Sequence, residues 1–165
     1  ISALQKYEWE LPCGIKYVFF EGEECIEEYG PADGLHGSRR LAKEWSENGL
    51  LKKCRAMILL DMVGDKDLTI TIPKGCTKSL IDRTLRLAQE NGLGSRFRVF
   101  ESDMIDDHVP FLERGVPAID LIDFNYGPGN AFWHTTQDSL DKISAQSIKT
   151  VADFALGLYW NIAED

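Results

Sequence analysis

The chain has 165 residues, and 44% of them are hydrophobic, which is enough to bury the core of one ordinary domain. Its 27 Asp and Glu residues outnumber its 18 Lys and Arg residues and give a formal net charge of -9. No basic cluster is longer than Ser38-Arg39-Arg40, and no apolar run approaches the roughly 20 residues of a membrane-spanning helix. We therefore expect no nucleic-acid partner and no membrane partner.

The first residues, ISALQKYEWELPCG, lack an initiator Met, a basic segment and an apolar segment, so they are not typical of a signal peptide. We favour an extracytoplasmic or secreted location, although the sequence leaves the compartment open. Cys13, Cys25, Cys54 and Cys76 show neither CxxC nor Cys/His spacing. We therefore expect small buried side chains, not a structural zinc site.

Apolar segments alternate with amphipathic ones along the chain. Strands are predicted over residues 14–20, 55–64, 67–73, 96–102 and 116–124, and helices over residues 37–49, 77–91 and 106–115. A last helix begins after Ser144 as its N-cap, and Asp106 or Asp107 caps the helix before it. The buried stripe of the last helix is predicted to comprise Ile148, Val151, Ala152, Ala155, Leu156 and Tyr159.

The predicted strands are apolar almost throughout, which is typical of a mostly parallel sheet with helices on both faces. We therefore expect an α/β fold with three layers, α/β/α. In such folds, ligands bind beyond the carboxyl ends of the strands. Glu23, Glu24 and Asp61 directly follow predicted strands, and His134 lies in the loop after another.

Two adjacent carboxylates at a strand end repel each other unless a cation or a shared proton is near. If Glu24 binds Zn²⁺, Glu23 can take a proton from the metal-bound water. The alternative is a solvated acidic pair, and Asp61 equally well caps a turn. His134 lies in a Gly/Pro-rich loop between aromatic residues, where it is either a zinc ligand or a hydrogen-bonded loop histidine.

The other two histidines are assigned no role in chemistry. His36 lies in the loop DGLHGS without an acid placed to orient it, so we expect it to be structural or exposed. His108 follows two acids at the start of a predicted helix, where packing is the expected role.

Five segments, in order, resemble the C-terminal half of the zinc-dependent aminopeptidases and of the related glutaminyl cyclases. They are FFEGEE, YGPADGLHGSRRLA, LLDMVGD, DDHVPFLERGVPAIDLID and WHTTQDSLDKIS. The match runs from about Gly14 to the last helix. The resemblance implies a zinc-exopeptidase-like fold, a peptide substrate and one or two zinc ions.

The resemblance also implies roles for particular residues. Glu23 corresponds to the general acid/base of the family, Glu24 to a zinc ligand and His134 to the zinc-binding histidine. Asp61 corresponds to a ligand of the second metal in the two-zinc peptidases, and to a member of a proton relay in the cyclases. The resemblance therefore implies Glu24, Asp61 and His134 as metal ligands.

Three further residues follow from the same resemblance. Asp106 corresponds to an acid of the cyclase proton relay, so it joins Glu23 among the catalytic candidates. Trp133 corresponds to a residue that lines the substrate pocket, and Tyr29 is assigned to substrate binding with it.

The family takes further metal ligands from a His-x-Asp segment and a Gly-x-x-Asp-type segment upstream of the first block. This chain begins at what resembles the end of the preceding helix, so we expect residues 1–165 to be one incomplete catalytic domain. The missing N-terminal segment would supply those ligands. We therefore expect the isolated chain to be inactive, even with zinc.

Three functions remain open at this point. The primary hypothesis is an aminopeptidase, in which Glu23 deprotonates water and then protonates the leaving amine. The second is a glutaminyl-peptide cyclotransferase, in which Glu23 carries a proton from the α-amine to departing ammonia. The third is a non-catalytic peptide-binding module that keeps the fold without the metal.

Overall fold

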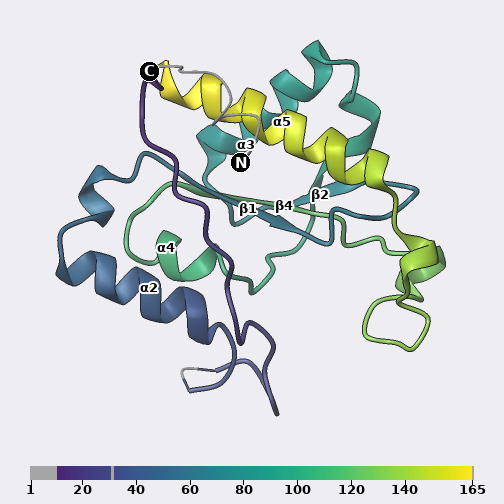
Figure 1. Ribbon diagram of the computed structural model, residues 1–165, viewed down its shortest axis with the longest axis horizontal. Coiled ribbons are helices and arrows are strands. Elements are labelled where there is room, and N and C mark those ends of the chain that lie inside the picture. The colour runs from purple at the N-terminus through teal and green to yellow at the C-terminus, as the bar shows by residue number, and fades with distance from the viewer. Residues whose placement is uncertain (1–10, 31, 165) are drawn as a thin grey trace.

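The computed structural model describes residues 11–30 and 32–164, and Figure 1 shows helices on both sides of a small sheet. No helix in these two ranges is long and apolar enough to cross a membrane. The helix end expected in residues 1–11 falls almost entirely in residues 1–10, which lie outside the described residues. The elements, in chain order, are α2 (His36–Glu47), η1 (Leu51–Lys53), β1 (Met57–Asp61), β2 (Ile70–Pro73), α3 (Lys78–Glu90), η2 (Gly94–Arg96), β3 (Phe97–Phe100), α4 (Val109–Leu112), β4 (Ala118–Ile122), η3 (Pro128–Asn130), η4 (Leu140–Lys142) and α5 (Ala145–Ala163).

The pairs formed between these strands are parallel. β1 pairs with β4, so that Met57 lies opposite Ala118 and Asp61 lies opposite Ile122, and β2 pairs with β3. β2 also lies beside β4, where the hydroxyl of Thr71 donates to the carbonyl oxygen of Ile122 at 3.0 Å. The two parallel pairs are two-stranded sheets that lie side by side in the order β1, β4, β2, β3, and the predicted parallel strands are confirmed.

Helices cover both faces of this sheet, as predicted. In Figure 1, α3 and α5 lie on one side and α2 and α4 lie on the other. The larger core lies under α3 and α5, where the rings of Phe97 and Phe154 have centroids 4.4 Å apart. A smaller core joins α2 to α4 through Ala42 and Phe111. Burying one such large side chain contributes about 1.5–3 kcal/mol to stability, so both layers help to fix the ends of the strands.

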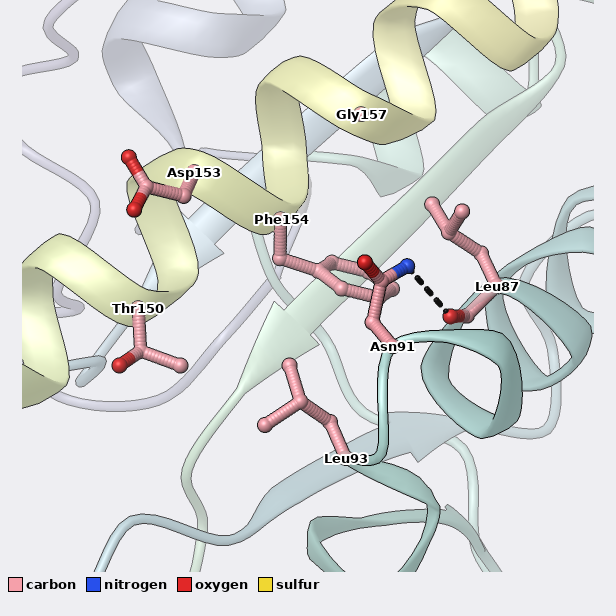
Figure 2. A pocket seen from close by; sticks show the side chains of 7 residues that line it. All are labelled: Leu87, Asn91, Leu93, Thr150, Asp153, Phe154 and Gly157. Atoms are coloured by element: carbon pink, nitrogen blue, oxygen red, sulfur yellow. Dashed lines mark hydrogen bonds between the residues drawn. The ribbon is translucent and has the colours of Figure 1, made fainter.

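A hollow of about 220 Å³ lies between α3 and α5. Figure 2 shows Phe154 and Gly157 of α5 facing Leu87 of α3 across it. At its edge, the side-chain amide of Asn91 donates to the carbonyl oxygen of Leu87 at 2.8 Å. None of the predicted site residues lines this hollow.

The strand predicted over residues 14–20 is wrong, because these residues form no strand with any described part of the chain. Phe19 is 88% exposed and Tyr17 is 50% exposed, whereas Phe20 packs on the smaller core. An apolar composition favours a strand, but the backbone also needs a neighbour to pair its N–H and C=O groups. The described residues offer this segment no such neighbour.

The helix predicted over residues 106–115 contracts to α4, and its predicted cap is wrong. His108 is the N-cap and makes no side-chain capping bond. Asp106 instead accepts the N–H of Asp107 on its Oδ1 at 2.6 Å. Gly115 ends the segment as predicted, with a φ of 79° that favours glycine.

The helices predicted over residues 37–49 and 77–91 are confirmed as α2 and α3. Ser144 also caps α5 as predicted, since its side chain accepts the N–H groups of Gln146 and Ser147. Of the predicted stripe on α5, Val151 is buried, Ala155, Leu156 and Tyr159 are half-buried, and Ile148 and Ala152 are exposed. The other buried residues of α5 are Ser147, Phe154, Leu158 and Ala163. α5 is apolar around much of its circumference, so its sequence does not single out one face.

The cysteine prediction holds only in part. Cys76 is buried, whereas Cys13, Cys25 and Cys54 are half-buried, and all four are free. His36 is exposed and His108 is buried, as expected.

Candidate active site

The Glu23-Glu24 pair is held in place by the start of α2. The backbone N–H groups of Leu35, His36 and Gly37 donate to the carbonyl oxygens of residues 21–23 at 2.8–3.0 Å. These bonds satisfy N–H groups that a helix leaves unpaired at its first turn, where α2 has no side-chain cap. A Cβ on Gly37 would lie 2.7 Å from the carbonyl oxygen of residue 21, so the close approach requires glycine.

Glu23 and Glu24 have hydrogen-bond partners from two other segments. The Tyr29 hydroxyl lies 2.7 Å from Oε1 of Glu23 and 3.3 Å from Oε2 of Glu24. His134 Nε2 lies 2.7 Å from Oε1 of Glu24. Residues 110 positions apart in the sequence therefore meet at one point, as the sequence predicted for Glu24 and His134.

The backbone and aromatic neighbours fix the position of His134. Its φ of 53° lies in the left-handed region, which a residue with a side chain adopts at a cost of about 1 kcal/mol or more. Trp133 stacks on the imidazole with ring centroids 4.1 Å apart, and Phe124 packs edge-on against Trp133. The indole covers one face of the imidazole, and Nε2 points to Glu24.

A cavity of about 290 Å³ opens at this point. The structure brings together five of the predicted site residues on its wall: Glu23, Glu24, Asp61, Trp133 and His134. Tyr29 and Asp106 do not line it. The remaining wall was not anticipated from the sequence and comprises Met62, Val63, Gly64, Asp65, Tyr126, Asp138 and Ile143.

A second group of acids lies buried behind the cavity. Asp106 is 6% exposed, and burial, with the charges of Asp61, Glu23 and Asp107, raises its pKa to about 7. Burial likewise raises the pKa of Asp61, Asp107 and Glu23. For Glu23, the hydrogen bond from Tyr29 opposes the rise and the charge of Glu24 adds to it. Acids with raised pKa values at neutral pH are suited to holding and passing protons.

Asp120 belongs to this buried group and was missed in the sequence. It is fully buried in β4, and burial, followed by the charges of Asp106 and Asp61, raises its pKa well above the usual value. Within the described chain, neither of its carboxylate oxygens has a hydrogen-bond partner. The available signal was an Asp in the middle of the apolar run VPAIDLIDF, since a carboxylate at the centre of a buried strand requires an explanation.

His108 faces Asp120 without forming a hydrogen bond, because Nδ1 and Oδ2 are 3.8 Å apart. Burial lowers the pKa of His108 to about 4, so its imidazole is neutral at physiological pH. Its burial agrees with the predicted packing position.

The donor set fits part of a zinc site. His134 and Glu24 offer the imidazole nitrogen and carboxylate oxygen that zinc takes, and these atoms face each other beside the cavity. Catalytic zinc usually has three protein ligands and a water. Residues 11–30 and 32–164 contain no group of three or more His, Cys, Asp or Glu side chains placed to hold an ion. Asp61 shares the cavity but does not complete such a group.

The three-layer fold and this acidic edge define the class of protein. The sequence profile of peptidase family M28 matches residues 1–159, so the chain belongs to that family.

Named relatives and solved structures resemble the chain over one part of their length. The glutaminyl-peptide cyclotransferase of Drosophila melanogaster is 34% identical over 155 residues, covering 82% of this chain and 43% of that protein. A crystal structure of an Acidobacteriales bacterium glutaminyl cyclase has 40% identity and a TM-score of 0.81, covering 88% of this chain and 52% of that one. An aminopeptidase from Aneurinibacillus sp. strain AM-1 has 30% identity and a TM-score of 0.63, with 79% and 30% coverage.

The chain therefore spans less than half the length of the curated relatives it matches. The similarity confirms the expected family and the zinc-exopeptidase-like fold.

Proposed function

We propose that this chain carries part of the active site of a glutaminyl-peptide cyclotransferase. In this reaction, the α-amine of an N-terminal glutamine attacks the carbonyl carbon of its own side-chain amide. A C–N bond forms, the bond to the amide nitrogen breaks, and ammonia leaves while the peptide keeps its length. The primary hypothesis from the sequence, an aminopeptidase, becomes the second candidate.

The position of Asp61 carries this proposal. Burial raises the pKa of Asp106 and of Asp120, and the charge of Asp61 adds to the rise in both. This arrangement suits a proton relay better than a second metal site, and the likeness to two glutaminyl cyclases points the same way.

Glu23 is the proposed proton carrier. It lines the cavity, and burial raises the pKa of its carboxyl group, so it can accept a proton from the attacking amine and release it to the departing nitrogen. Asp61, on the same cavity wall, and the buried Asp106 are proposed to hold and pass protons with it. The indole of Trp133, on the cavity wall, is proposed to pack against the glutamine side chain.

Glu24 and His134 are the proposed zinc ligands of this chain. When bound, zinc would supply Lewis acidity at the carbonyl oxygen of the amide. Because the described residues offer two converging donors, we propose that further ligands come from the part of the relatives' length that this match does not span. Asp61 remains the candidate for a second ion in the peptidase alternative.

The aminopeptidase alternative has specific support as well. The chain resembles the Aneurinibacillus aminopeptidase at 30% identity, and Asp61 lines the same cavity as Glu24 and His134. In that reaction Glu23 would deprotonate water and protonate the leaving amine, so the same carboxylate serves both chemistries.

Two substrates separate these functions. The protein at its full natural length, loaded with zinc, is given a Gln-initiated peptide and, separately, Leu-p-nitroanilide. We expect ammonia and a peptide of unchanged length from the first, and no nitroaniline from the second. Nitroaniline release, or a shortened peptide without ammonia, would contradict the cyclotransferase proposal.

A further inference from the structure

Hydrogen bonds within the loop that follows Glu24, and one from α2, fix the conformation of this loop. Both carboxylate oxygens of Asp33 accept backbone N–H groups, from Ile26 and from Glu27, each at 2.8 Å. The backbones of Gly30 and Asp33 also pair at 3.1 and 3.3 Å. Arg39 of α2 then donates to the carbonyl oxygen of Gly30 at 2.6 Å. These bonds hold residues 26–30 in a defined conformation.

In this conformation, the Tyr29 hydroxyl lies beside the carboxylates of Glu23 and Glu24. The ring lies directly against Gly34, where an added Cβ would come within 2.5 Å of a ring carbon. Gly34 is buried and has a φ of 75°, so both the space and the backbone require glycine there. The ring therefore packs against Gly34, and its hydroxyl lies 2.7 Å from Oε1 of Glu23.

A phenol has one proton to donate, so the shorter of its two contacts takes the hydrogen bond. That contact is to Glu23, because Glu24 lies farther away at 3.3 Å. Tyr29 does not line the cavity, whereas Glu23 and Glu24 do.

We propose that Tyr29 is a positioning residue, whose hydroxyl holds the Glu23 carboxylate in the orientation that proton transfer requires. Asp33 and Gly34 act through Tyr29: Asp33 fixes the loop by its hydrogen bonds, and Gly34 leaves the space that the ring fills. This role differs from the substrate contact assigned to Tyr29 by resemblance. It rests on the proposed function, in which Glu23 is the proton carrier.

The test removes the hydroxyl and keeps the ring. In the zinc-loaded protein at its full natural length, Tyr29→Phe should lower kcat by about tenfold or more, with KM changed by less than about twofold. Zinc content and the melting temperature should stay near those of the unchanged protein. Tyr17→Phe is the matched control, because Tyr17 is half-exposed and its hydroxyl has no hydrogen bond within the described residues. It should leave kcat unchanged.

A second variant tests the loop without touching the ring. Asp33→Asn replaces one of two acceptor oxygens by an amide that cannot accept an N–H group. The loss of one of the two hydrogen bonds to Asp33 should lower kcat by a smaller factor than Tyr29→Phe does, again at nearly constant KM.

Other outcomes would overturn the positioning role. A raised KM at unchanged kcat would show that Tyr29 binds substrate, and a lowered melting temperature at unchanged kcat would show a structural role only. A readout without turnover separates this proposal from the proposed function. The hydrogen-bonded Tyr29 hydroxyl proton should give a slowly exchanging downfield proton NMR signal that Tyr29→Phe lacks. If the protein turns over neither substrate but shows this signal, the function proposal fails while the hydrogen bond stands. If the signal is missing, the positioning proposal fails whatever the activity.

Discussion

Two groups of carboxylates flank the same edge of the sheet, and they differ in burial and in hydrogen bonding. On the rim, Glu23 and Glu24 line the cavity and are bonded by Tyr29 and His134. Behind it, Asp106 and Asp120 are 6% and 0% exposed, and in the described chain the oxygens of Asp120 have no hydrogen-bond partner. The rim carboxylates therefore have hydrogen-bond partners beside the cavity, whereas burial raises the pKa of both buried acids.

The largest effect should come from the rim. Glu23→Gln keeps the shape of the side chain but removes its proton affinity, so turnover should fall by about 10²–10⁴-fold. Zinc content should be unchanged, because Glu24 and His134 are intact. Activity assays and metal analysis on the same samples check both halves. Retained turnover would remove Glu23 from the mechanism, and lost zinc would make it a ligand.

The next effect should also come from the rim, but through the metal. His134→Ala removes one of the two converging donors, and zinc affinity should fall by more than about a hundredfold. Competition with a chelating dye measures it. His36→Ala is the control, since His36 is exposed and lies outside the cavity wall. Equal zinc affinity in the two variants would contradict the proposed ligand.

The buried acids predict a pH dependence of stability. The pKa of Asp106 is about 7 in the folded state and near 4 in an unfolded chain. Between these values the folded state binds a proton that the unfolded state does not, so stability is lost as the pH rises from about 4 to 7. Asp106→Asn cannot ionise. Relative to the unchanged protein, it should therefore gain about 4 kcal/mol at pH 8 and nothing at pH 4.

Urea unfolding of metal-free protein at several pH values measures this difference. A difference that does not vary with pH would show that Asp106 is not held protonated. Asp82→Asn is the control, since Asp82 is an exposed residue paired with Lys78 on α3, and it should show no such rise.

The smallest effect concerns the contact between the start of α2 and residues 21–23, which holds the Glu23-Glu24 pair in place. Gly37→Ala would place a Cβ 2.7 Å from the carbonyl oxygen of residue 21, and should lower the free energy of unfolding by about 1–3 kcal/mol. The matched control is Gly157→Ala on α5, where the Cβ would meet Leu87 at an ordinary 3.7 Å beside the hollow of Figure 2. It should raise the free energy of unfolding by up to about 1 kcal/mol, because alanine favours a helix. The same sign for both variants would contradict the close contact.

The sequence predicted the parallel sheet and its helices because apolar strands and glycine or serine helix ends are local signals. It also singled out Glu24 and His134, whose side chains lie 2.7 Å apart, although the strand expected before Glu24 does not form. It failed at residues 14–20, where strand formation depends on a neighbour and not on composition. It missed Asp120, whose significance comes from the other acids that the fold packs around it. The contact between Tyr29 and Glu23 depends on the path of one loop, which no periodicity encodes.

One isotope experiment tests the central claim most directly. A peptide whose N-terminal glutamine carries heavy nitrogen only in its side-chain amide is incubated with the zinc-loaded protein at its full natural length. If the site closes a lactam with Glu23 carrying the proton, the heavy nitrogen leaves as ammonia while the peptide keeps its length, and Glu23→Gln abolishes the release of ammonia. Heavy nitrogen recovered in free glutamine, beside a peptide one residue shorter, would contradict the account and identify an aminopeptidase.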